Sequence, residues 1–187
     1  AETHPRKRGQ GAAGRPYTYV PTWSGFCYTA FVMDLYARRI VGWATSSRMD
    51  TDFVLGALEQ AIWTRKHREG RCLTGLVHHS DHGSQYLSIA YTGRLVDEGI
   101  EASAGAVGSS YAGAAAEALN KSYKRELVWR DGPWKDRDDL ETATARWVSW
   151  YNRTRPHRAN PDDLSPAAAE HRYHRNHTTT AAAPATA

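Results

Sequence analysis

Cysteine is scarce in this sequence, with only Cys27 and Cys72 among 187 residues. The two stand far apart and in no metal-ligand spacing, which argues against a disulfide framework and against a cysteine zinc site. We expect both thiols to be reduced and mostly buried. His78, His79 and His82 lie close together in the chain, but no Cys or His partner stands at zinc-finger spacing, so we set a zinc site aside.

Long hydrophobic runs are also missing. No apolar stretch approaches the roughly 20 residues that a membrane-spanning helix needs, and the N-terminus is basic and polar without the apolar core of a secretory signal. These absences predict a cytoplasmic protein with no membrane partner. Charge of one sign is in small excess only, because 24 Lys and Arg face 20 Asp and Glu. That balance weakly favours an anionic partner such as nucleic acid.

The first part of the chain has the pattern of β-strands. Residues 17–22, 26–35 and 40–45 are rich in aromatic and β-branched side chains, with turn-forming residues between the first two stretches. The short connections predict an antiparallel meander of three strands. We interpret Trp23 and Trp43 as core or edge packing rather than as base-stacking platforms.

Helical periodicity begins after the meander. Apolar residues recur at helical spacing over residues 51–67, with Asp50 or Thr51 as the candidate cap. The pattern then predicts a buried strand at 76–79, a helix at 84–98, a strand at 100–103, a mobile loop of small residues at 104–113, and a last helix around 140–151. Strands followed by alternating helices and strands predict a mixed α/β sheet with helices packed on it.

Two acidic residues stand out at the centre of the chain. Asp81 follows the carboxyl end of the predicted strand at 76–79, where ligands collect in open α/β sheets. Glu117 lies in a run of strong helix formers, and offsets of three and seven place Asn120 and Lys124 on its helical face. Two carboxylates on different elements suit a hard divalent cation such as Mg²⁺, and Lys124 would lie where a phosphodiester backbone could run.

Each of these signals has a plainer interpretation. Asp81 could be the N-cap of a helix that starts near Ser84. Glu117 and Lys124 could belong to a solvated helix face. The basic residues of the first 16 positions could be a solvated tail, and the cluster of Arg153, Arg155, His157 and Arg158 could be a solvated basic turn rather than a phosphate contact.

The combination of motifs resembles a known family. Thirty-five residues separate Asp81 from Glu117, and Lys124 follows Glu117 by seven. On these residues the chain resembles the integrase-like catalytic domain of bacterial insertion-sequence transposases, a branch of the DDE recombinases with an RNase H-like fold. The resemblance covers residues 17–167. Further matching stretches are Thr18-Tyr19-Val20, Val32-Met33-Asp34, Arg38-Arg39-Ile40-Val41-Gly42-Trp43, Lys124-Arg125-Glu126, Tyr151-Asn152 and Arg155-Pro156-His157.

The resemblance implies a fold, partners and site residues. It implies an RNase H-like mixed five-stranded sheet with helices packed on it at residues 17–167. From composition, we expect a disordered basic arm at 1–16 and a low-complexity tail at 168–187. It implies DNA as partner, in the form of transposon ends and target, with a homo-oligomer possible, in the bacterial cytoplasm at the nucleoid. Mg²⁺ or Mn²⁺ would occupy a two-metal site. The implied catalytic metal ligands are Asp81 and Glu117, and the implied DNA-binding residues are Lys124, Asn120, Lys121 and Arg155.

The chain departs from the family at two places. The family has a third acid two residues before Thr18-Tyr19-Val20, but this chain has Pro16 there, which has no side-chain oxygen for a metal. Where the family has Tyr-Asp-Asn, this chain has Tyr111-Ala112-Gly113. Asp34 is expected to be structural rather than a substitute. The expectation is a truncated or frameshifted transposase core for DNA integration, impaired in phosphodiester cleavage and strand transfer. The alternative is an inactive DNA-binding or regulatory remnant.

Overall fold

The computed structural model describes residues 9–12, 17–80, 89–103 and 109–181. The strands are β1 (Gly9–Ala12), β2 (Tyr17–Thr22), β3 (Gly25–Met33), β4 (Ile40–Ser46), β5 (Val77–Ser80) and β6 (Glu101–Ser103). The α-helices are α1 (Thr51–Trp63), α2 (Ile89–Asp97), α3 (Ser109–Tyr123), α4 (Trp129–Asp131), α5 (Arg137–Arg153) and α6 (Pro166–Ala181). Two π-helical turns, η1 (Thr64–Arg68) and η2 (Lys124–Val128), continue α1 and α3, and η3 (Pro161–Asp163) is a 3₁₀ turn.

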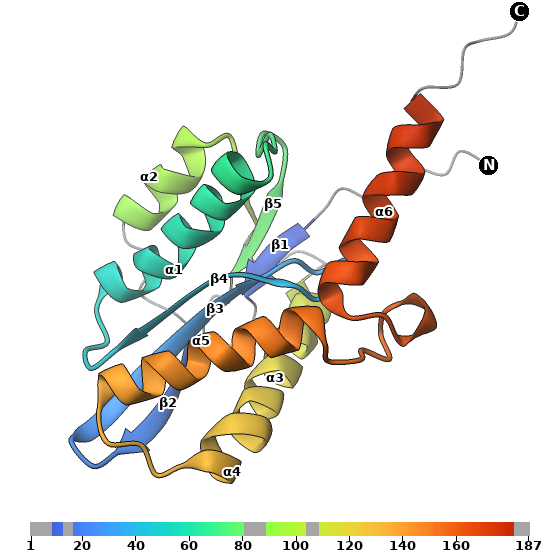
Figure 1. Ribbon diagram of the computed structural model, residues 1–187. Helices are drawn as coiled ribbons and strands as arrows, with labels where there is room; N and C mark the ends of the chain where they lie inside the picture. Colours follow the sequence, from blue (N-terminus) through green and yellow to red (C-terminus); the bar gives the residue numbers. More distant parts are fainter. Residues whose placement is uncertain (1–8, 13–16, 81–88, 104–108, 182–187) are drawn as a thin grey trace, which may run out of the picture.

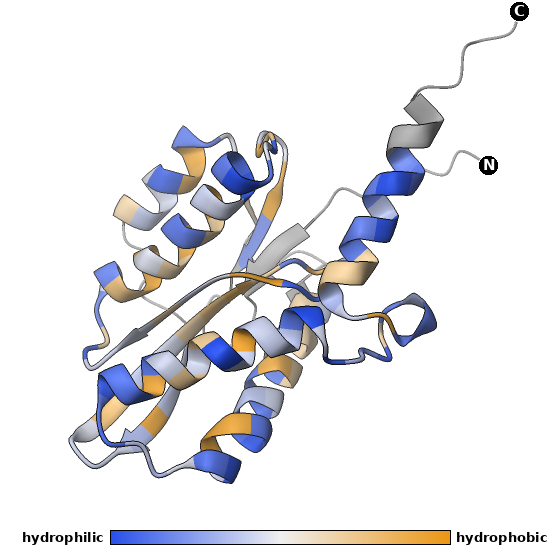
Figure 2. Cartoon of the chain, viewed as in Figure 1, coloured by the Kyte–Doolittle hydropathy of each residue, from blue (hydrophilic) through white to orange (hydrophobic). Residues whose placement is uncertain are grey.

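The strands form a layer with helices on both faces (Figure 1). Helices α1 and α2 cover one face, α3 and α5 cover the other, and α6 extends away from the body. Hydrophobic and hydrophilic residues alternate along α1 and α5, as expected for helices with one face on a sheet, whereas α6 is hydrophilic over most of its length (Figure 2). The predicted α/β architecture is confirmed. None of the described helices is long and apolar enough to cross a membrane.

The sheet differs from the single five-stranded sheet that we expected. The described strands form two three-stranded sheets, β2-β3-β4 and β1-β5-β6. The first is the predicted antiparallel meander, and the second is parallel throughout. β1 ends at Ala12 and pairs with β5, whereas β2 begins at Tyr17 and pairs with β3; residues 13–16 lie outside the described part of the chain.

Strand β3 divides the interior into two cores. Cys27, Phe31 and Met33 point into the core that α3 and α5 complete, whereas Ala30 and Val32 point into the core under α1 and α2. This division follows from the two-residue side-chain period of a strand, and it requires a strand that is apolar on both faces. The near-continuous apolar run of β3 is therefore the sequence signature of its central place.

Helix α1 lies unusually close to β4. The Asp50 carboxylate accepts a hydrogen bond from the Phe53 backbone N–H at 2.9 Å and caps the helix, as the sequence predicted. The helix then crosses Gly42, where a Cβ atom would stand 2.2 Å from the Ala57 carbonyl oxygen and 2.7 Å from the Ala61 nitrogen. The glycine of the Ile40-Val41-Gly42 stretch is therefore a packing requirement.

We predict that Gly42→Ala lowers the free energy of unfolding by about 3 kcal/mol, since both obstructing atoms belong to the backbone and cannot rotate away. Gly56→Ala is the matched control within α1 itself. A Cβ at Gly56 meets nothing within 4 Å. That variant is expected to raise stability by about 1 kcal/mol through helix propensity. Urea unfolding of both variants measures the effect, and equal stabilities would contradict the close approach.

Several segments expected to lack regular structure are helical or extended. Residues 9–12, expected to be part of a disordered arm, form β1 beside β5. Helix α3 begins at Ser109, inside the predicted loop of 104–113, and residues 104–108 lie outside the described residues. Helix α6 runs through most of the expected tail of 168–187. The expected disorder of residues 9–12 and the expected loop at 109–113 are not observed, because pairing and packing with distant parts of the chain decide those segments. The low compositional complexity predicted for the tail is compatible with α6.

Two packing expectations are also corrected. Cys27 is buried, but Cys72 is exposed, and both are free thiols. Trp43 packs partly buried against the core, whereas Trp23 is 79% exposed. Trp23 lies in the tight turn between β2 and β3, where its side chain is exposed to solvent.

His78 is a buried histidine on β5, two residues before the last residue of the strand. Its Nε2 lies 3.0 Å from the Tyr91 hydroxyl. Burial, and secondly the neighbouring His79, lowers the pKa of His78 to about 4. An unfolded histidine titrates near 6.5. Between these values the unfolded chain therefore binds more protons than the folded one, so stability is complete above about pH 6.5 and is lost as the pH falls toward 4.

We predict that lowering the pH from 7 to 5 removes about 2 kcal/mol of stability through His78 alone. His78→Gln offers an amide to the Tyr91 hydroxyl but cannot titrate. The loss between the two pH values should be smaller by that amount in the variant. Urea unfolding at both pH values measures it, and an identical loss in both proteins would show that His78 is not the titrating group.

Candidate functional site

Glu117 is carried on the exposed face of α3. The helix lies against both β1 and β5. The Glu117 side chain is 65% exposed. Its Oε1 atom forms an ion pair with the Nζ atom of Lys121, one helical turn further along, at 2.7 Å. This hydrogen bond, and secondly the charge of Lys121, holds the pKa of Glu117 below its usual value. The carboxylate is therefore ionised at neutral pH and accessible to an oxygen-seeking cation or to a partner.

The strand that leads to Asp81 lies beside this helix. β5 ends at Ser80, directly before Asp81, and β1 runs parallel to it with Ala12 opposite Ser80. The carboxyl ends of both strands therefore meet at one edge, the edge at which α/β sheets bind ligands. Asp81 and Pro16 themselves lie outside the described residues. Their proximity to Glu117 remains a prediction, supported by the contact of α3 with both strands.

The donor set fits a divalent cation only in part. Within the described ranges, no group of three or more His, Cys, Asp or Glu side chains could hold a metal ion. Glu117 supplies an ionised oxygen donor, and Asp81 would supply a second from the end of β5. Pro16 supplies none, so the pair of acids could hold one hard cation but leaves a two-metal site short of a ligand.

Lys124 and Asn120 follow Glu117 along the helix as predicted. Asn120 is half-buried, and the Lys124 ammonium lies 4.6 Å from the centre of the Tyr19 ring on β2. Lys121 is exposed and pairs with Glu117. The cation–π contact holds the Lys124 ammonium beside β2.

Arg155 is occupied inside the protein. Its guanidinium donates to both oxygens of Glu126 at 2.6–3.0 Å and lies 5.5 Å from the Tyr151 ring. With 19% of its side chain exposed, it joins η2 to the end of α5. The observed role of Arg155 is thus structural, and the described contacts leave its neighbours Arg153 and Arg158 as the exposed cations of this turn.

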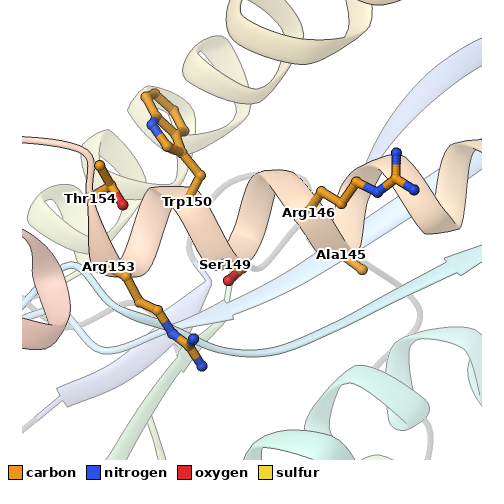
Figure 3. A pocket seen from close by; sticks show the side chains of 6 residues that line it. All are labelled: Ala145, Arg146, Ser149, Trp150, Arg153 and Thr154. Carbon is orange, nitrogen blue, oxygen red and sulfur yellow. The ribbon is translucent and has the colours of Figure 1, made fainter.

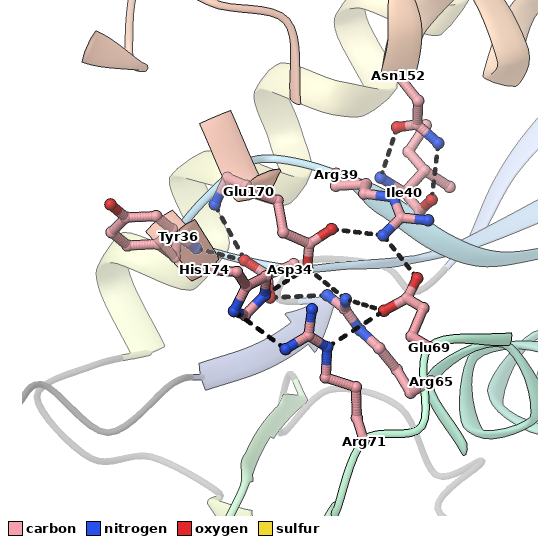
Figure 4. Close-up of polar contacts among 11 residues, drawn as sticks. Asp34, Tyr36, Arg39, Ile40, Arg65, Glu69, Arg71, Asn152, Glu170 and His174 are labelled. Atoms are coloured by element: carbon pink, nitrogen blue, oxygen red, sulfur yellow. Dashed lines mark hydrogen bonds and ion pairs between the residues drawn. The ribbon is translucent and has the colours of Figure 1, made fainter. Parts of the chain in front are cut away.

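Asp34 belongs to a buried charge cluster rather than to the candidate site. Its Oδ1 accepts the backbone N–H groups of Tyr36 and Ala37, and its Oδ2 accepts from Arg65 at 2.9 Å. Every oxygen of this acid is therefore engaged, as expected for a structural residue. Figure 4 shows the cluster continuing from Arg65 to Glu69 and Glu170, with Arg39, Arg71 and His174 around them.

A shallow depression lies on the outer face of α5. Its volume is about 540 Å³, and its lining residues are Ala145, Arg146, Ser149, Trp150, Arg153 and Thr154 (Figure 3). The guanidinium groups of Arg146 and Arg153 project from a surface that also contains Trp150 and small residues, and none of the lining side chains is a carboxylate. The depression can meet an anionic partner but cannot hold a metal ion.

Sequence reasoning missed the aromatic residues beside Lys124. Tyr19 and Phe26 are 52% and 60% exposed and lie on neighbouring strands. Aromatic residues at alternate positions of the first two strands were a visible signal, but they are equally typical of core packing. Only the position of α1 decides which of them remain uncovered.

Comparison of the sequence with protein families identifies related proteins. Two profiles described as Integrase core domain match residues 15–110 and 98–161. A Mycobacterium tuberculosis protein named as a transposase for insertion sequence element IS986/IS6110 is 54% identical over 138 residues, which are 74% of this chain and 50% of that protein. The Shigella sonnei transposase for insertion sequence element IS629 is 52% identical over 139 residues, 74% of this chain and 45% of that protein. The chain thus spans about half the length of these curated relatives.

The fold matches solved structures of low sequence identity. The HTLV-2 integrase catalytic core domain, in complex with magnesium and in trimeric form, superposes with a TM-score of 0.60 at 13% identity, covering 87% of this chain and 95% of that one. At this identity the likeness concerns the fold alone. The arrangement of strands and helices described above is therefore the arrangement of a retroviral integrase core, which is RNase H-like.

Proposed function

The chain belongs to the integrase core domain family of insertion-sequence transposases, and on that premise we propose that it is the catalytic core of a DNA transposase with reduced activity. One observation carries the proposal. An exposed, ionised Glu117 stands on a helix packed against the strand that leads to Asp81, and thirty-five residues separate the two acids. The spacing and the two elements are those that the family uses for its acids.

The candidate residues have different roles in phosphodiester cleavage and strand transfer. A water molecule or a DNA 3′ hydroxyl attacks the phosphodiester in line. Asp81 and Glu117 would hold Mg²⁺ or Mn²⁺, which when bound activates the attacking oxygen and stabilises the leaving oxygen. Lys124 positions the DNA end by its charge, and Lys121 and Asn120 lie on the same helix to contact phosphates. The HTLV-2 core in complex with magnesium supports the choice of a divalent metal.

Pro16 is the reason for expecting reduced activity. It stands where the family places its first acid, immediately before β2, and offers no metal-binding oxygen. Asp34 cannot replace that acid, because both of its oxygens bond within the buried cluster. A second candidate function follows from the same residue: a DNA-binding or regulatory domain that has lost cleavage altogether. We further propose that the chain forms homo-oligomers, as its trimeric structural neighbour does.

DNA binding tests both candidate functions. We predict binding to double-stranded DNA that weakens as salt rises, because phosphate contacts release counterions. Lys124→Ala should reduce the slope of log affinity against log salt by about one. Lys66→Ala is the matched control. Lys66 is a partly exposed cation on η1 that pairs with Glu98, outside the candidate site, so its loss should leave the slope unchanged. Fluorescence anisotropy of a labelled duplex measures it, and salt-independent binding or no binding would refute both functions.

A further inference from the structure

The exposed aromatic residues of the β2–β3 hairpin continue a row that starts in the core. Tyr17 packs against Tyr28 and against Phe53 of α1, with ring centres 5.9 and 6.4 Å apart. Beyond the end of this contact, Tyr19 and Phe26 lie on the same hairpin with more than half of each residue in solvent. Burial cannot explain why two large rings stand there, since none of the described helices covers them.

The two rings form a corner with a cation beside it. Their centres are 6.1 Å apart and their planes meet at 79°, so a flat group stacked on one ring touches the edge of the other. The Lys124 ammonium lies 4.6 Å from the Tyr19 ring centre. An aromatic face next to a cation matches the chemistry of a nucleotide, because the base stacks on the ring and the phosphate pairs with the ammonium.

The corner lies at a definite distance from the candidate catalytic acid. Lys124 follows Glu117 by seven residues, which is about 10 Å along a helix. At roughly 3.4 Å per nucleotide of one strand, that length corresponds to about three nucleotides. A base inside a duplex already has a neighbour on each face, so only an unpaired base could stack on the corner.

We propose that Tyr19 and Phe26 form a stacking site for an unpaired base about three nucleotides from the DNA bond held at Glu117. The proposal rests on the proposed function in taking DNA as the substrate, and it adds a preference for opened ends. In the free protein Lys124 sits on the Tyr19 ring; on binding, the phosphate draws the ammonium away and the base takes its place. A protein partner or a second copy of the chain is the competing occupant.

Two duplexes with the same number of phosphates test the proposal. One is fully paired, and the other has its three terminal base pairs replaced by mismatches. The probe is bound without divalent metal, so that binding is measured apart from cleavage. We expect the unaltered chain to bind the mismatched end at least about fivefold more tightly, the lower limit for stacking of one base. Tyr19→Ala and Phe26→Ala should each bring the ratio to within about twofold of unity, whereas Tyr19→Phe should keep it.

Trp63→Ala is the matched control, because Trp63 is a similarly exposed aromatic residue at the far end of α1. It should leave the ratio unchanged. Equal binding of both duplexes by the unaltered chain would overturn the stacking site while leaving the proposed function in place. Failure to bind either duplex would overturn both. A concentration-dependent dimer in sedimentation that Tyr19→Ala abolishes would assign the corner to a second copy and also overturn the proposal.

Discussion

Pro16→Asp is expected to raise nicking of supercoiled plasmid in Mg²⁺ or Mn²⁺ by at least about 100-fold over the unaltered chain. Metal-ion stabilisation of developing charge is worth several kcal/mol, and each 1.36 kcal/mol is a factor of ten in rate. The substitution places an oxygen donor at the position of the family's first acid, where this chain has Pro16. The rest of the scaffold stays in place, because the position lies directly before β2 and β2 is paired along its length to β3.

Glu117→Gln separates the possible outcomes of that experiment. It removes the charge of the carboxylate and keeps its size, and Glu117 is exposed, so the fold should not change. In the Pro16→Asp background it should return nicking to the level of the unaltered chain. In the unaltered chain it should change little. Strong metal-dependent nicking by the unaltered chain, lost in Glu117→Gln, would contradict the proposed impairment and would mean that another group completes the site.

The parts of the fold that sequence predicts are those decided by local pattern. The meander of β2, β3 and β4 and the helix after Asp50 follow from side-chain periodicity, turn residues and a cap. Strand β1 could not be found in this way. Its Gly-Gln-Gly-Ala stretch has no strand pattern of its own, and it is extended because β5, more than sixty residues away, pairs with it. Long-range pairing decides such segments, so propensity does not reveal them.

The relative positions of the candidate site residues were predictable from the sequence, but their contacts with other elements were not. Glu117, Asn120 and Lys124 share a helix, so their relative positions follow from sequence offsets alone. The Glu126 partner of Arg155 and the Tyr19 ring beneath Lys124 come from other elements. No offset along the chain encodes those contacts. The family resemblance therefore implied Arg155 as a DNA-binding residue, whereas its ion pair with Glu126 could not be predicted from the sequence.

Arg65→Met is expected to lower the free energy of unfolding by about 3–5 kcal/mol. Arg65 is 2% exposed, and its guanidinium pairs with Asp34, Glu69 and Glu170. Burial alone would lower the pKa of Arg65, but these carboxylates outweigh it and raise the pKa, Glu170 first among them. Removing the cation leaves buried negative charges facing one another, with Arg39 and Arg71 at the margin of the cluster.

The neighbouring residue provides the control for this effect. Lys66 follows Arg65 on η1 and also forms an ion pair, with Glu98 at 2.8 Å, but 43% of its side chain is exposed. Lys66→Met should therefore change stability by less than about 1 kcal/mol. Urea unfolding of both variants separates buried from exposed charge, and similar losses in the two would show that the cluster is not held together by Arg65.

Glu170 connects the same cluster to α6, which has few apolar residues to hold it. Burial would raise the pKa of Glu170, but Arg65 and Arg39 hold it below its usual value. Stability from a lowered carboxyl pKa is present above the unfolded pKa and is lost as the pH falls through the folded one. Glu170→Gln at neutral pH removes the same charge. It should speed amide exchange in α6 while α1 stays protected, because α6 is attached to the body through this cluster and the end of α5.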